Sequence, residues 1–496
     1  MTRISTRTAA SLLLCSLFPL HSAAAEAARP NFVLVLADDQ GYGDMGYTGH
    51  PHAITPNFDA MAANAMRFDG FHAAHPVCSP TRVSILTGRD PNRAGCHAWG
   101  GTLREGDVTF ANLLGDAGYH TAHFGKWHVG SVLKEGNANP AGAGFDRWVS
   151  APNFYENDPT LADQGVATAF EGESSLLTMD LAVEWIAGLP RAGGDGDGPL
   201  ERPFAAVVWF GSPHHPWISA PEFLEPYKEM GLSGEKAHFL GEVTGMDAAM
   251  GRLNEALAEM GIKDDTVVWY TSDNGALRQV GSAGPYRGYK GEIWQGGLRV
   301  PALLQWPAVI REPVSVGFPA STIDMLPTLL ELAGVELPDG HPALDGTSLA
   351  PWIANPAEPP AAAPDRGIGF WYIPAPGRPV RSELLMRTLL DAGNDLDALD
   401  PETRDDLLYT DAGDMARPRA PDFRGGHAAW LRDPWKLHRT VENDGTKNHK
   451  LFNLADDPAE SADVAEEHPE ILEKLSGELE AWQADVIHDL NHPPGG

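Results

Sequence analysis

Three short runs of almost continuous apolar residues stand out in the first part of the chain, at 32–37, 203–210 and 266–270. Runs of this length without alternation are typical of strands that are buried on both faces of a sheet. Longer stretches between them, such as 175–189 and 241–260, carry apolar residues at helical spacing. Strands that alternate with helices predict an α/β fold built on a large doubly wound mixed sheet flanked by helices.

The alternation ends before a Pro- and Ala-rich stretch at 351–365. We therefore expect a large domain over 26–350 and a smaller C-terminal α+β subdomain over 366–490, with short antiparallel strands. The stretch 469–487 has apolar residues at helical spacing and predicts a terminal helix. The acidic segment 391–418 carries no clear pattern.

The first 25 residues predict a signal peptide. Arg3 and Arg7 form a basic start, an apolar run follows at 9–20, and Ala23-Ala24-Ala25 offers a cleavage site of small residues. The apolar run is too short to span a membrane. We expect an exported protein, periplasmic or secreted, without a membrane anchor.

The formal charge of −32 is large. It argues against nucleic acid or an anionic membrane as a partner. It also repels anionic substrates at long range, so a site for such a substrate needs strong local positive charge and a metal ion.

Polar side chains follow each of the three apolar runs: Asp38 and Asp39, then His214, then Asp273 and Asn274. Ligands bind outside the carboxyl ends of the strands in open α/β sheets. Asp is also common in turns, but adjacent buried carboxylates are costly unless something satisfies them. Carboxylates with an amide form a hard oxygen set that favours Ca²⁺ or Mg²⁺, although Asp/His mixtures also hold zinc.

Cys78 lies at the expected start of a helix, because Pro80 suits a first helical turn and Gly88 a helix end. A helix N-terminus favours an anion, and Arg82 lies one turn further on. The plainer interpretation is a buried cysteine, or a disulfide with Cys96 in an oxidising compartment. We interpret Cys78 as the reactive residue and Cys96 as a buried thiol.

Two further candidates follow a short predicted strand at 119–124. In an extended segment, Lys126 and His128 would share one face because side chains alternate. Loop residues that could face a substrate, with ordinary loop packing as the alternative, are His97, Trp99, Asn153, Tyr155, His215 and Trp217, together with the segment 391–418.

Several motifs occur together and in a fixed order: Cys-x-Pro-x-Arg at 78–82, Gly-Lys-Trp-His at 125–128, Pro-His-x-Pro at 213–216, Ser-Asp-Asn-Gly at 272–275 and Gly-Gly-Leu-Arg-Val-Pro at 296–301. With them, the chain resembles the type I, formylglycine-dependent sulfatases of the alkaline-phosphatase-like superfamily. The resemblance covers about 29–482. Gln295 is a departure, because many members carry Glu there, and it puts a local hydrogen bond in doubt.

The resemblance implies that a formylglycine-generating maturation enzyme oxidises Cys78 to formylglycine (3-oxoalanine), whose hydrate attacks sulfate. Arg82 and Lys126 would hold the hydrate. His214, helped by Lys290, would protonate the leaving oxygen, and His128 would take a proton from the second hydroxyl. One Ca²⁺ would be bound by Asp38, Asp39, Asp273, Asn274 and the modified Cys78.

The function implied is hydrolysis of sulfate monoesters, above all on sulfated carbohydrates. One alternative is a phosphonate or phosphate monoester hydrolase on the same fold. The other is a non-catalytic protein that binds sulfated glycans, with Cys78 unmodified. The sugar, the position of its sulfate and the oligomeric state do not follow from the residues.

Overall fold

The computed structural model describes residues 29–493 apart from 105, 135–137, 194–197, 409–416 and 443. The predicted signal peptide at 1–25 lies outside the described residues. Among the helices of the described part, none is both long and apolar enough to cross a membrane.

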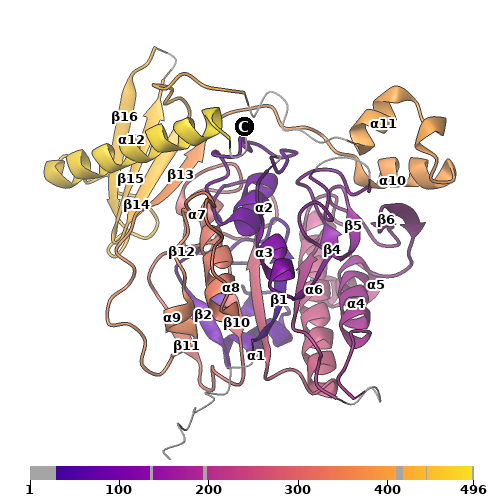
Figure 1. The fold of residues 1–496 in the computed structure, drawn as a ribbon. Coiled ribbons are helices and arrows are strands. Elements are labelled where there is room, and N and C mark those ends of the chain that lie inside the picture. Colours follow the sequence, from indigo (N-terminus) through magenta and orange to yellow (C-terminus); the bar gives the residue numbers. More distant parts are fainter. Residues whose placement is uncertain are drawn as a thin grey trace, which may run out of the picture.

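A mixed sheet of ten strands forms the centre of the molecule, in the order β11-β2-β10-β9-β1-β8-β4-β5-β6-β7 (Figure 1). Its middle is parallel, with β1 (Asn31–Ala37) between β9 (Thr266–Ser272) and β8 (Phe204–Trp209). The parallel part continues through β4 (His120–Lys126) and β5 (Arg147–Ala151). The edges are β6 (Thr160–Asp163) and β7 (Val166–Ala169) on one side, and β10 (Leu303–Gln305), β2 (Met66–Phe68) and β11 (Val314–Val316) on the other.

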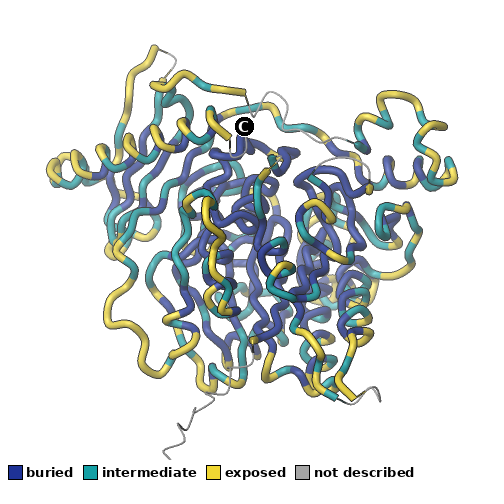
Figure 2. Tube along the Cα trace, in the orientation of Figure 1, coloured by how far each residue is buried: buried dark blue, intermediate teal, exposed yellow. Residues whose placement is uncertain are grey.

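Helices cover both faces of this sheet, and β1 shows why. Phe32, Leu34 and Leu36 belong to one buried core, and the alternating Val33 and Val35 belong to another. The first core is closed by α2 (Cys78–Thr87), α3 (Phe110–Asp116) and α8 (Met325–Ala333). The second is closed by α1 (Pro56–Ala62), α4 (Ser174–Ala187), α5 (Pro221–Glu229) and α6 (Gly234–Glu259). Figure 2 shows the resulting buried centre.

The C-terminal part forms a separate antiparallel sheet of four strands, β13 (Ile368–Tyr372), β14 (His427–Arg432), β15 (Trp435–Val441) and β16 (Lys447–Asn453). The terminal helix α12 (Pro469–Asn491) packs on it through Leu475 and Leu479. The helices α10 (Ser382–Asp391) and α11 (Pro401–Leu407) lie on the other side of the molecule in Figure 1. The predicted fold class is therefore confirmed, whereas the domain boundaries stay predictions.

A buried ion cluster around Glu460 joins the smaller sheet to the part of the chain that holds the large sheet. This carboxylate accepts hydrogen bonds from the His438 side chain (2.6 Å) and from the backbone N–H of Gln295 (2.6 Å), and Lys436 Nζ lies 3.0 Å away. Burial alone would raise the pKa of Glu460, but Lys436 and His438 lower it to about 2. Gln295 also keeps a side-chain hydrogen bond, since its Oε1 lies 3.0 Å from His72 Nε2.

Replacing Glu460 by Gln should lower the free energy of unfolding by about 3 kcal/mol, because it leaves the Lys436 ammonium buried without its counter-charge. Urea unfolding followed by tryptophan fluorescence measures the difference. The matched control is Glu470→Gln, whose exposed side chain lies 4.0 Å from His468, and it should change the value by less than about 0.5 kcal/mol. Equal effects of the two substitutions would contradict the role given to this cluster.

Candidate functional site

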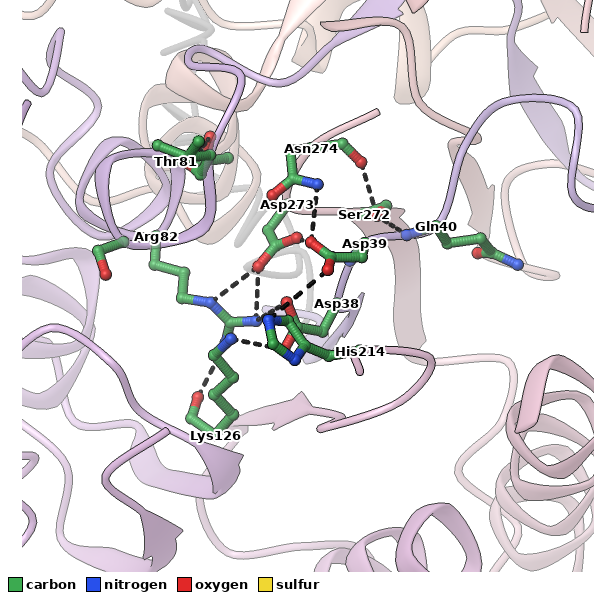
Figure 3. A network of polar contacts seen from close by, with 12 residues as sticks. Asp38, Asp39, Gln40, Thr81, Arg82, Lys126, His214, Ser272, Asp273 and Asn274 are labelled. Carbon is green, nitrogen blue, oxygen red and sulfur yellow. Dashed lines mark hydrogen bonds and ion pairs between the residues drawn. The ribbon is translucent and has the colours of Figure 1, made fainter. Parts of the chain in front are cut away.

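The carboxyl ends of β1 and β9 bring three carboxylates and an amide together. The two strands pair in register up to Ala37 and Ser272, so the residues that follow become neighbours. The backbone N–H of Asp39 donates to Asp273 Oδ1 (3.1 Å), and Asn274 Nδ2 donates to Asp39 Oδ1 (3.0 Å). Asp39 adopts a left-handed backbone conformation (φ 73°), which turns the chain at the strand end. Figure 3 shows this buried network, which also contains Asp38.

Helix α2 brings a thiol and a guanidinium to the same place. Cys78 is its first residue and is buried. Arg82, one turn later, donates to Asp273 Oδ2 through Nη2 (2.7 Å) and Nε (3.1 Å). Its guanidinium also lies over the ring of Trp209, 5.0 Å from the centroid. The helix start predicted from Pro80 and Gly88 is thus present, and it fixes both groups beside the carboxylates at the strand ends.

Lys126 ends β4, and its Nζ lies 2.5 Å from Asp38 Oδ2. The expectation that Lys126 and His128 share one face of a strand is wrong. The strand ends at Lys126, and His128 has a left-handed backbone (φ 56°) in the turn that follows. His128 nevertheless lines the same pocket as Cys78.

His214 and Lys290 approach from two loops. His214 Nδ1 lies 2.6 Å from the carbonyl oxygen of His215, so this nitrogen carries the proton and donates. Its Nε2 lies 3.7 Å from Asp39 Oδ2, and its ring stacks on Phe154 with centroids 4.5 Å apart. Lys290 forms an ion pair with Asp39. Both side chains line the pocket with Cys78.

Burial dominates the electrostatics of these groups. It raises the pKa of Asp38 to about 7 against the opposing charge of Lys126, and it raises the pKa of the Cys78 thiol. Burial also lowers the pKa of His214 to about 3. Asp39 differs, because Lys290 and His214 hold its pKa below the usual range in spite of burial. Cys78 as an ordinary thiol is therefore poorly suited to act as a thiolate nucleophile at neutral pH.

The donor set fits a hard divalent cation. Asp38 Oδ1 and Asn274 Oδ1 are buried and have no hydrogen-bond partner among the described residues. Ligand atoms of Asp38, Cys78 and Asp273 lie within 4.8 Å of one another, and so do those of Asp38, Asp39 and His214. Carboxylate and amide oxygens are the ligands that Ca²⁺ and Mg²⁺ prefer. Two buried oxygens without hydrogen-bond partners, on residues that follow the paired strands β1 and β9, indicate a place where a cation would bind.

A pocket of about 390 Å³ opens above Cys78. Of the loop residues predicted to face a substrate, Trp99 and Asn153 line it. His97 is buried with Nδ1 2.7 Å from Asn92 Oδ1, the Tyr155 hydroxyl pairs with Thr178, and Trp217 packs against His215. None of these four is among the lining residues, so substrate contacts of His97, Tyr155, His215 and Trp217 stay predictions.

Sequence reasoning missed part of the pocket wall. Phe154, Pro379, Val380 and Arg381 line it, whereas the described residues of the segment 391–418 do not. Residues 373–381 carry no pattern beyond their prolines and a glycine, so nothing in the sequence placed this segment at the site.

The comparisons with known proteins agree with this geometry. The sulfatase family model matches residues 30–335. Human arylsulfatase A is 35% identical over 402 residues, which cover 75% of this chain and 76% of the relative. The solved structure of Ps i-CgsB in complex with k-i-k-neocarrahexaose has a TM-score of 0.72 at 23% identity and covers 94% of both chains. A second solved structure, of a protein in complex with its substrate D-glucosamine-2-N,6-O-disulfate, has a TM-score of 0.67 at 20% identity over 94% of this chain and 99% of that one.

A match over more than half of the chain, together with this degree of identity, establishes the relationship. The chain belongs to the sulfatase family of sulfuric ester hydrolases.

Proposed function

We propose that this sulfatase hydrolyses sulfate monoesters of carbohydrates with a formylglycine derived from Cys78 and a bound Ca²⁺. The observation that carries the proposal is the position of Cys78, at the start of α2, with its sulfur within 4.8 Å of oxygens of Asp38 and Asp273. Burial raises the pKa of the Cys78 thiol, which argues against a role as a thiolate nucleophile.

Asp38, Asp39, Asp273, Asn274 and the modified Cys78 would hold the cation. A bound divalent ion supplies Lewis-acid polarisation and stabilises developing negative charge. The hydrated aldehyde of formylglycine supplies a hydroxyl nucleophile and a second hydroxyl through which the enzyme can release sulfate. Arg82 and Lys126 contribute fixed positive charge beside Cys78, which an anionic ester needs in a protein of net charge −32.

In this proposal, two histidines transfer protons. His214 presents Nε2 to the pocket, because Nδ1 is engaged by a carbonyl oxygen. An incoming anionic ester favours the protonated imidazole, and Nε2–H then donates to the leaving oxygen with Lys290 beside it. Both ring nitrogens of His128 are buried and have no hydrogen-bond partner among the described residues. His128 is therefore available to accept a proton at the Cys78 side of the pocket.

Replacing His214 by Ala should lower kcat/KM for a sugar sulfate by about 10²- to 10⁴-fold, the usual contribution of general acid catalysis. An alkoxide leaving group needs protonation, whereas the acidic phenol of 4-nitrophenyl sulfate does not. The same variant should therefore lose less than about tenfold on the aryl ester. Steady-state kinetics on both esters measures this difference. An equal loss on the two esters would contradict the role of His214 as the acid.

The carbohydrate class is supported by the two solved structures, whose ligands are a neocarrahexaose and a glucosamine disulfate. The exposed Trp99 ring at the pocket offers an apolar face of the kind that sugars pack against. The test is a screen of sulfated mono- and oligosaccharides, together with phosphate esters of the same alcohols. Turnover of sulfated sugars above their phosphate counterparts is expected. Preference for the phosphate esters would overturn the proposal in favour of a phosphomonoesterase.

A further inference from the structure

Residues 373–381 form a segment that connects β13 of the small sheet to α10 and passes over the active-site pocket. In Figure 1 this connection crosses above α2. Its last three residues, Pro379, Val380 and Arg381, line the pocket together with Cys78 and Lys290. The segment thus forms the outer wall of a site whose floor belongs to the large sheet.

Four contacts hold this segment in place. The backbone N–H of Arg378 donates to the carbonyl oxygen of Trp99 (3.0 Å), and Asn153 Nδ2 donates to that of Val380 (3.1 Å). Arg378 Nη2 also donates to Asp406 Oδ1 on α11 (2.9 Å). Gly377 lies against the Trp99 ring so closely that a Cβ there would come within 2.1 Å of it. These contacts hold the segment against Trp99 and Asn153, which also line the pocket, and against α11.

Arg381 ends this wall and differs from the arginines around it. Its side chain is exposed, and its guanidinium takes part in no hydrogen bond or ion pair within the described part of the chain, although its carbonyl oxygen accepts from the backbone N–H of Leu385. Nearby Arg378 binds Asp406, and Arg387 binds Glu383 (2.7 Å), which also accepts from the backbone of Thr160. None of the residues that line the pocket is acidic. An unpaired guanidinium at the mouth of a pocket is unusual in a protein with 68 acidic and 36 basic residues.

We propose that Arg381 is a specificity-determining residue that binds a second anionic group on the substrate, a carboxylate or a further sulfate. The scissile sulfate enters toward Cys78, Arg82 and Lys126, so the positive charges of Arg82 and Lys126 at the floor of the pocket already balance its charge. A guanidinium at the rim can form a bidentate contact with a further planar or tetrahedral anion on the same or a neighbouring sugar. This inference rests on the proposed function and narrows its substrates to sugar sulfates with at least two negative charges.

The test measures inhibition constants against hydrolysis of 4-nitrophenyl sulfate, so it does not require turnover of the sugars. One pair of probes is glucosamine-2-N,6-O-disulfate with N-acetylglucosamine 6-O-sulfate, whose 2-amino group is uncharged. The other is a sulfated disaccharide that contains a uronate, with its methyl ester. In the native-sequence enzyme, the doubly charged member of at least one pair should bind about 10- to 100-fold more tightly, and the pair that shows this effect identifies the second anion as sulfate or carboxylate.

In Arg381→Ala this preference should fall to less than about threefold, and Arg381→Lys should restore part of it. Arg404→Ala, which removes from α11 a partly exposed guanidinium that pairs with Asp397, is the matched control and should keep the preference. A preference that persists in Arg381→Ala, or that is absent from the native-sequence enzyme in both pairs, would overturn the inference. Failure to hydrolyse any sulfate ester would instead contradict the proposed function, so the two failures are distinguishable.

Discussion

Cys78→Ala should reduce turnover of every sulfate ester by roughly four orders of magnitude or more, because it removes the atom from which the nucleophile is made. The side chain is buried at the start of α2, and losing its sulfur leaves the contacts of Arg82 and Asp273 unchanged. Steady-state kinetics of purified protein on 4-nitrophenyl sulfate and on the best sugar sulfate measures the loss. Circular dichroism and thermal unfolding show whether the variant remains folded.

The chain offers a matched control for this substitution. Cys96 is equally buried, but it is not among the residues that line the pocket. Cys96→Ala should lower stability by about 1 kcal/mol and leave kcat/KM within about twofold. Substantial activity in Cys78→Ala, with Cys96→Ala as the more damaging change, would contradict the assignment of the nucleophile.

Removal of divalent metal is the second large effect that we expect. Exhaustive chelation should lower kcat by at least about 10²-fold, because three buried carboxylates then face the anionic ester without a cation to offset their charge. Ca²⁺ should restore activity and raise the unfolding temperature of the chelated protein, since a ligand that binds only the folded state stabilises it.

The Asn274→Ala variant distinguishes weaker metal binding from a general electrostatic effect on the reaction. It removes the uncharged amide oxygen Oδ1, which is buried and has no hydrogen-bond partner among the described residues. The variant should need more Ca²⁺ for half-maximal activity, with a smaller change in kcat at saturating Ca²⁺. Full activity after chelation, or restoration by zinc and not by Ca²⁺, would contradict a hard-cation site.

The sequence predicted the main sheet and the floor of the site well, and the reason is physical. β1, β8 and β9 are buried on both faces, so their apolar runs are continuous, and the polar residues that follow them must lie at one edge of a parallel sheet. The thiol and Arg82 were predictable because Pro80 and Gly88 mark the ends of a helix.

The outer wall of the pocket could not be predicted in this way. Its residues at 373–381 are held by contacts with Trp99, Asn153 and Asp406, which are far away in the sequence. Contacts of this kind leave no periodic pattern of apolar and polar residues in the sequence. The prediction that His128 shares one strand face with Lys126 was wrong for a related reason. His128 lies in a left-handed turn after β4, whereas the alternation of side chains assumes an extended backbone.

The conversion of Cys78 is the central claim, and the mass of one peptide tests it most directly. Trypsin releases residues 68–82, which contain Cys78, from protein made together with a formylglycine-generating enzyme. The account predicts a peptide that has lost H₂S and gained one oxygen, in a fraction that rises in step with specific activity. Fully active protein in which this peptide carries only an unmodified thiol would contradict it.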